Sequence, residues 1–220
     1  MILILTLLST AWSLELAPVD RPSVGTSAFA IERGGLQVEA GLQIDANQAQ
    51  STHSFPTMLR IGIHDRFELR PYTSIVSLSD TDTLILPASG LQGKVELYTP
   101  EDKDVALGAL ASSDMNGGSG QVLLDAWKND WSIWLNTGYS LDYETTTGSA
   151  SVVGGVAYAL PNQQGLFVES GTTISSTTAV TIQSGYSSTV NDVQIDVYTL
   201  KEINTPGSWQ LATGLSFRLR

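Results

Sequence analysis

Strict alternation of apolar and polar residues constrains the fold of this chain more than any other feature. Residues 36–44 alternate from Leu36 to Ile44, and the runs 54–62 and 67–75 repeat the pattern. A period of two predicts half-buried β-strands, and no window shows a helical period of 3.6 residues. Less regular segments continue the theme at 91–98, 105–111, 121–127, 131–141, 151–160, 165–174, 179–187, 193–200 and 208–219. The chain is therefore predicted to be all-β, with about twelve antiparallel strands.

The connections between these segments alternate in length. Compact turn chemistry occurs at 64–65, 100–103, 128–130, 161–165 and 191–192, whereas longer polar loops are expected at 46–53, 78–88, 113–119, 142–150 and 201–207. The connection 174–178 is short and breaks the trend. Tight periplasmic turns and longer outer loops are typical of outer-membrane barrels. The alternation therefore predicts an up-and-down transmembrane β-barrel. Because the number of strands is even, both termini are expected on the periplasmic side.

The composition suits a barrel better than a helical membrane protein. Charged residues make up 15% of the 220 residues, against about 25% in an average globular protein. No apolar run after Leu14 is long enough for a transmembrane helix. The net charge of -11 argues against nucleic acid as a partner. The absence of cysteine excludes disulfides and thiolate chemistry.

The chain divides into three predicted parts. Met1 to Leu8 is apolar, and Ala11-Trp12-Ser13 offers small residues for signal peptidase, so residues 1–13 are predicted to be an export signal. A buried first strand of a cytosolic protein is the alternative. Residues 14–34 are expected to form a periplasmic N-terminal segment, which could close the passage, and residues 35–220 are expected to form the barrel.

Aromatic residues recur at a spacing that matches a membrane. Trp131 and Tyr139 share one face of a predicted strand, as do Trp209 and Phe217. Eight residues of a tilted strand span roughly 20 Å along the membrane normal. We therefore expect these four residues at the two membrane interfaces, although two strands of a soluble sandwich are the alternative. Many outer-membrane barrels end in an aromatic residue that the insertion machinery reads, and this sequence departs from that pattern because Arg218-Leu219-Arg220 follow Phe217.

The polar face of the strands carries the candidate functional residues. They are Glu39, Arg60, Glu68, Arg70, Lys94 and Glu96, with Glu169 and Asp196 further along the chain. A slip of one residue would move all of them into lipid, which constrains the assignment of faces. The group around Arg60 and Glu68 could select solutes by charge at a constriction. Alternatively, it is an ion-pair network that only braces the lumen.

Part of the sequence resembles a known family. Asp20-Arg21-Pro22, Ser27-Ala28-Phe29 and Gly35-Leu36-Gln37-Val38-Glu39-Ala40-Gly41 resemble the opening of outer-membrane transporters linked to the meta-cleavage pathway of phenol degradation. The stretch from Leu59 to Arg70 resembles the strand, tight turn and charged strand that follow in members of this family. The resemblance covers about residues 20–70 and implies a barrel in the outer membrane more than it implies a substrate.

Other chemistry finds little support in the sequence. His53 and Ser54 are neighbours on a predicted strand and would point to opposite faces, which disfavours a Ser-His hydrolase. His64 is expected in a turn. Asp80 and Asp82 form an incomplete calcium pattern, and the glycine-rich stretch 117–120 is expected to be a flexible loop without a following helix.

These observations favour a passive channel or uptake protein of the cell outer membrane. It would take small organic solutes, aromatic or apolar compounds among them, and is expected to need no cofactor or metal. A structural or adhesive barrel with a sealed lumen, an outer-membrane lipid hydrolase and a soluble β-sandwich lectin are the alternatives.

Overall fold

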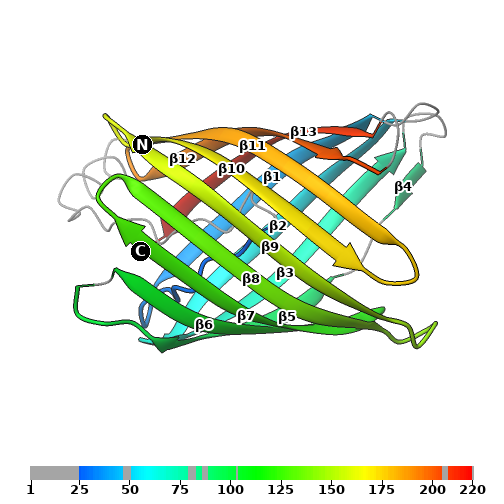
Figure 1. Ribbon diagram of the computed structural model, residues 1–220, viewed down its shortest axis with the longest axis horizontal. Coiled ribbons are helices and arrows are strands. Elements are labelled where there is room, and N and C mark those ends of the chain that lie inside the picture. Colours follow the sequence, from blue (N-terminus) through cyan, green and yellow to red (C-terminus); the bar gives the residue numbers. More distant parts are fainter. Residues whose placement is uncertain are drawn as a thin grey trace, which may run out of the picture.

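The computed structural model describes residues 25–46, 51–78, 83–85, 89–102, 104–204 and 208–219, which form a closed antiparallel β-barrel (Figure 1). The strands are β1 (Leu36–Ala46), β2 (Ser51–His64), β3 (Phe67–Leu78), β4 (Thr83–Ile85), β5 (Gly90–Tyr98), β6 (Val105–Asp114), β7 (Gly117–Lys128), β8 (Trp131–Asp142), β9 (Gly148–Leu160), β10 (Gln164–Ile174), β11 (Thr178–Val190), β12 (Val193–Glu202) and β13 (Trp209–Leu219). No helix within the described ranges is long and apolar enough to cross a membrane.

The barrel closes where the first and last strands pair. β1 and β13 run antiparallel in continuous register from Leu36–Leu219 to Ala46–Trp209. Twelve strands form the ring, and the short β4 pairs with β3 alone. The predicted up-and-down barrel of about twelve strands is confirmed. We call the end at which β1 begins and β13 ends the proximal end, and the opposite end the distal end.

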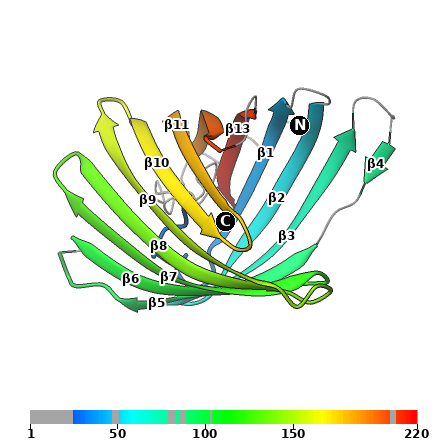
Figure 2. The same ribbon diagram turned by 45° about the vertical axis from the view of Figure 1, so that its right-hand side comes forward.

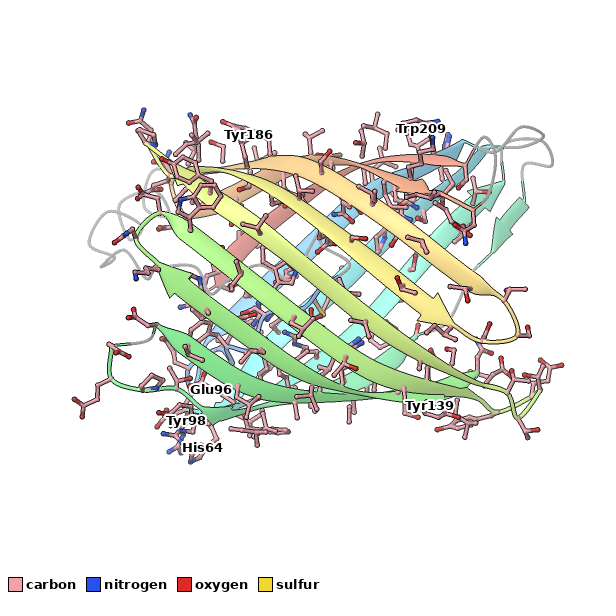
Figure 3. The ribbon with its side chains drawn as sticks, viewed as in Figure 1. His64, Glu96, Tyr98, Tyr139, Tyr186 and Trp209 are labelled. Carbon is pink, nitrogen blue, oxygen red and sulfur yellow. The ribbon has the colours of Figure 1, made fainter. Side chains whose placement is uncertain are left out.

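The alternation in the sequence becomes an outer and an inner face. Along β8, Ile133 and Leu135 are exposed on the outside, whereas Asn136 is buried on the inside. Tyr139, Tyr186 and Trp209 point away from the barrel (Figure 3). Exposed apolar side chains occur along the other strands as well. Apolar side chains on the outer wall are suited to lipid. Closure of the sheet suits lipid as well, because no unpaired backbone edge is left in the hydrocarbon.

Several of the predicted tight turns are present at the proximal end. Asn191 and Asp192 join β11 to β12 with φ of 50° and 63°. Two consecutive positive φ values are typical of the type I′ turn, whose twist matches the strands that it joins. Asn129 has φ of 55° between β7 and β8. His64 ends β2 at the turn to β3, where its Nδ1 accepts the N–H of Arg66 at 3.4 Å.

One predicted loop was wrong. The segment 113–119 and its glycine-rich continuation to Gly120 were expected to be a flexible loop, but β6 runs to Asp114 and β7 starts at Gly117. The Asp114 carboxylate accepts the N–H groups of Asn116 at 2.7 Å and Gly117 at 2.9 Å, which tightens the connection to two residues. The glycines continue the ladder, since Gly118 pairs with both Ser113 and Leu141.

One more expected loop contains a strand, and several other expectations concern residues that the structure does not describe. The expected loop 78–88 contains the short strand β4. The export signal at 1–13, the portion 14–24 of the N-terminal segment and the calcium pattern at Asp80 and Asp82 lie outside the described residues.

The outer face gives a prediction of stability. Replacing Leu135, which lies mid-strand and is 47% exposed, with arginine should lower the free energy of unfolding in lipid vesicles by about 2–4 kcal/mol. Ile174→Arg, at the distal end of β10, is the matched control, and its cost should be about 0–1 kcal/mol because the side chain reaches the interface. Urea titration followed by tryptophan fluorescence measures both. Equal costs at the two positions would contradict a membrane-spanning outer face.

Candidate functional site

A stretch of chain that precedes β1 lies inside the barrel. We call residues 25–34 the inner segment, and Figure 2 shows it within the ring of strands. Ala28 and Ile31 have no exposed surface. The partners of the segment lie near mid-strand on β8 and β10 and closer to the proximal end on β3, β5 and β7. The inner segment therefore crosses the lumen from mid-height towards the proximal end.

Four carboxylates, each from a different strand, accept main-chain N–H groups of the inner segment. The bonds are Gly25 N to Glu169 Oε2 (3.2 Å), Ala28 N to Asp125 Oδ2 (2.7 Å), Ala30 N to Glu96 Oε2 (3.3 Å) and Ile31 N to Glu68 Oε2 (2.7 Å). Hydrogen bonds to an ionised acceptor are roughly twice as strong as neutral ones. The barrel wall thus binds the main chain of the segment at four positions, and Asp125 Oδ2 also accepts the Ser27 hydroxyl at 3.0 Å.

Cationic and amide groups of the wall bind the carbonyl oxygens of the same segment. Lys94 Nζ donates to Ser27 O at 3.0 Å, and Arg60 Nη2 donates to Phe29 O at 3.3 Å. Asn136 on β8 bonds Thr26 twice, because its Oδ1 accepts the N–H and its Nδ2 donates to the carbonyl. These contacts supply the partners that buried backbone groups require.

A buried network of ion pairs lies on the barrel wall next to the inner segment. We call it the charge cluster, and its members are Glu39, Arg60, Glu68, Arg70 and Lys94. Arg60 bridges Glu39 at 3.1 Å and Glu68 at 3.0 Å, while Lys94 Nζ lies 3.1 Å from Glu68 Oε1. Arg70 Nε also donates to Glu68. At most 1% of any of these five residues is exposed. Charges buried this deeply are tolerated only when they are paired and hydrogen-bonded.

An apolar contact fixes the middle of the inner segment. Ala28 packs in a buried cluster with Ala106, Leu110 and Leu123 of β6 and β7. Phe29 packs against the same cluster, and its ring lies 4.6 Å from that of Trp127 between centroids. The inner segment is therefore packed against the wall and hydrogen-bonded to it at the same time.

Two glycines allow the chain to leave the lumen and enter β1. Gly34 has φ of 80°, a conformation that a side chain would strain. Its N–H donates to Gly62 O at 2.8 Å, and Gly62 N donates to Gly35 O at 2.9 Å. A Cβ at Gly62 would collide with the carbonyl of Glu32. The segment thus turns at the proximal rim, where Glu32 also pairs with Arg218 at 3.1 Å.

The distal half of the lumen has a different chemistry. Hydroxyl pairs link neighbouring strands there, with Ser112 and Ser119 at 2.7 Å and Ser140 and Ser149 at the same distance. Tyr72 donates to Asp114 at 3.0 Å. This end carries neutral hydroxyl groups and carboxylates. The described basic residues of the inner face lie closer to the proximal end: Arg60, Arg70, Lys94 and Arg218.

The structure brings the predicted lumen residues together. Glu39, Arg60, Glu68, Arg70 and Lys94 form the charge cluster, and Glu96 binds the inner segment, whereas their proposed role in selecting solutes stays a prediction. Sequence reasoning missed Asp125 and Asn136 as partners of the segment, although alternation around them indicates an inward position. His53 and Ser54 lie on opposite faces of β2, since His53 pairs with Ile44 and Ser54 with Gln43.

The four predicted interface aromatics lie near strand ends on the outer wall. Trp131 begins β8 at the proximal end, and its ring lies 4.7 Å from that of Tyr158. Trp209 begins β13 at the distal end, where Lys201 Nζ lies 4.9 Å from its ring centroid. Tyr139 is exposed and Phe217 is half-buried. Their placement at membrane interfaces stays a prediction.

Similar folds occur among outer-membrane channels. The COG4313 outer-membrane channel from Pseudomonas putida F1 matches with a TM-score of 0.65 and 12% identity, over 93% of this chain and 100% of that chain. The KdgM porin matches with a TM-score of 0.61 and 10% identity, over 83% and 99%. The NanC porin matches with a TM-score of 0.61 and 12% identity, over 84% and 100%. No protein-family model and no curated protein matches the sequence. The fold is that of an outer-membrane β-barrel.

The charge cluster gives a second prediction of stability. Replacing Arg60 with methionine leaves Glu39 and Glu68 buried without their shared partner, which should cost about 3–5 kcal/mol of unfolding free energy. Glu32→Gln removes the ion pair with Arg218, but Glu32 is 54% exposed, so that loss should be below about 1 kcal/mol. Urea unfolding in vesicles compares the two variants. A loss at Arg60 as small as that at Glu32 would show that the cluster does not hold the lumen together.

Proposed function

We propose that this chain is a passive channel of the cell outer membrane for small organic solutes, and that the inner segment is its gate. The observation that carries the proposal is that the inner segment, and not the side chains of the wall alone, fills the proximal lumen. In this barrel a separate stretch of chain occupies it, held by hydrogen bonds to its main chain. A polypeptide held in this way can leave without any change in the barrel wall.

The polar inner wall supports passage of solutes once the segment has moved. Twelve strands about 4.8 Å apart and tilted by about 40° give a backbone radius of roughly 13 Å. In a barrel of this radius, the inward side chains leave a passage that admits one small organic molecule at a time. The fold shared with outer-membrane channels and porins is consistent with such a passage. In this arrangement the proximal end faces the periplasm, because the tight turns of outer-membrane barrels lie there.

The class of solute rests on the resemblance of residues 20–70 to transporters linked to phenol degradation. This resemblance favours small organic compounds, including aromatic ones, over large polar ones. Aromatic side chains on the inner face agree with it, since Trp127 and Trp134 both point into the barrel beside the inner segment. Insertion by the outer-membrane assembly machinery is part of the same proposal.

A sealed structural barrel is the second candidate function. The packing of Ala28 and Phe29 against β6 and β7 favours it, because this contact buries apolar surface that a mobile gate would have to expose. In that case the inner segment would act as a permanent core. The two candidates differ in whether the segment leaves its place.

A reversible cross-link distinguishes them, because the chain contains no cysteine of its own. Ala28→Cys combined with Ala106→Cys places two thiols in one buried cluster. Bridging them by oxidation or a short bis-thiol reagent should abolish conductance in planar bilayers, and reductant should restore it. Each single cysteine variant is the control, and migration on a non-reducing gel reports the cross-link.

Two results would count against the gate. Equal conductance in the bridged and reduced states would mean that solutes pass without movement of the inner segment. No conductance in either state, together with normal uptake of solutes by cells lacking the protein, would reject transport and leave the structural barrel.

A further inference from the structure

Three carboxylates of the barrel wall that bind the inner segment would line the passage once the segment leaves. Glu96, Asp125 and Glu169 each accept a main-chain N–H from the segment. Once those donors have moved away, the three carboxylates face the lumen. Each of these carboxylates then accepts hydrogen bonds from water or from a solute in place of the departed N–H, because burying a polar group without a partner is unfavourable.

The basic residues of the cluster do not compensate in the same way. Arg60 and Arg70 remain paired with Glu39 and Glu68, whose carboxylates come from the barrel wall itself. Lys94 loses Ser27 but keeps Glu68 at 3.1 Å. The charge cluster keeps three cations against two carboxylates, and Arg218 on β13 loses its ion pair with Glu32 of the segment. Departure of the segment still uncovers three carboxylates, on β5, β7 and β10, which outnumber the positive charges left without a matching carboxylate. The passage becomes more acidic as it opens.

Most of the other charged residues of the described inner face are acidic. Further acidic side chains lie on the described inner face at Asp45, Asp114 and Asp196. The backbone radius of the barrel is roughly 13 Å, and inward side chains narrow the passage further. Such charges therefore act on a permeating ion, because the Debye length is about 10 Å at 0.1 M salt. Their field favours cations and repels anions.

Aromatic rings lie next to two of the uncovered carboxylates. Trp134 Nε1 donates to Glu169 Oε2 at 3.1 Å, so the indole lies beside the carboxylate. Trp127 lies two residues after Asp125 on the same face of β7 and packs against Phe29 of the segment. When Phe29 leaves, a ring face of Trp127 is freed beside Asp125. A carboxylate next to an aromatic ring is the pairing that binds organic ammonium groups.

We propose that the open channel is selective for small organic cations, and that Asp125 and Glu169, with Trp127 and Trp134 beside them, determine this selectivity. The proposal rests on the proposed function, since it describes the passage that the departure of the inner segment opens. Such a solute replaces the departing N–H groups with its own positive charge and N–H or N-methyl groups. The solute thereby stabilises the open state, and anionic solutes gain no comparable partner.

The test is the ion selectivity of the full chain in planar bilayers. Reversal potentials are measured under a salt gradient, once with potassium chloride and once with tetramethylammonium chloride. We expect cation permeability to exceed chloride permeability by about fivefold at 0.1 M salt, and tetramethylammonium to pass despite its size. The double variant Asp125→Asn and Glu169→Gln should lower this ratio at least about twofold, because each amide keeps an acceptor oxygen and the shape of the acid but removes its charge.

Controls separate selectivity from folding and from the gate. Glu101→Gln removes one charge from the exposed turn between β5 and β6, and it should leave the ratio unchanged. Heat-modifiable migration on a gel checks that every variant forms a barrel. Trp134→Leu should lower the permeability of tetramethylammonium relative to potassium, because it removes the ring and keeps an apolar side chain of moderate size.

The outcomes identify which proposal fails. Conductance that is unselective or selective for chloride would overturn the cation proposal and leave the channel intact. Cation selectivity that the double variant does not alter would overturn the assignment to Asp125 and Glu169. No conductance in wild type or in the reduced cysteine variant, together with normal uptake of solutes by cells lacking the protein, would reject the channel itself, and this inference with it.

Discussion

The need to satisfy every backbone hydrogen bond in a lipid environment governs this structure. Continuous pairing of β1 with β13 meets that need by removing all strand edges from the ring. A closed sheet then forces every second side chain inwards. Because charges cannot face lipid at acceptable cost, Glu39, Arg60, Glu68 and Lys94 all lie on the inner face and must be satisfied there. Closure of the sheet thus creates the buried charges that define the candidate site.

The inner segment solves the problem that closure creates. It brings main-chain donors to acidic side chains and main-chain acceptors to basic ones, as Ala28 does for Asp125 and Ser27 does for Lys94. Its apolar residues pack against β6 and β7 in the same region. The wall therefore needs hydrogen-bonding partners in the lumen, and non-covalent contacts hold the inner segment there. This combination makes a gate physically reasonable inside a closed barrel.

The sequence predicted the barrel well, because alternation is a local signal that a closed sheet reproduces along each strand. It placed Arg60, Glu68 and Lys94 on the inner face for the same reason. It failed at 113–119, where glycine-rich composition suggested a loop although cross-strand pairing extends both β6 and β7. It also missed the partners of the inner segment. Asp125 and Ala28 are 97 residues apart and Glu169 and Gly25 are 144 apart, and no periodic pattern encodes such contacts.

Recognition of the inner segment through its main chain has an evolutionary consequence. Substitutions at Gly25, Ala28 or Ala30 change neither the N–H groups nor the carbonyls that the wall binds, so selection acts mainly on whether a residue is small enough to fit. Gly25 illustrates the limit, because a Cβ there would crowd the indole of Trp134. These three positions can therefore change in identity while their volume is conserved, whereas Ser27 and Phe29 also contact the wall through their side chains. A lineage of such proteins would be traced by residue size at these positions more readily than by residue type.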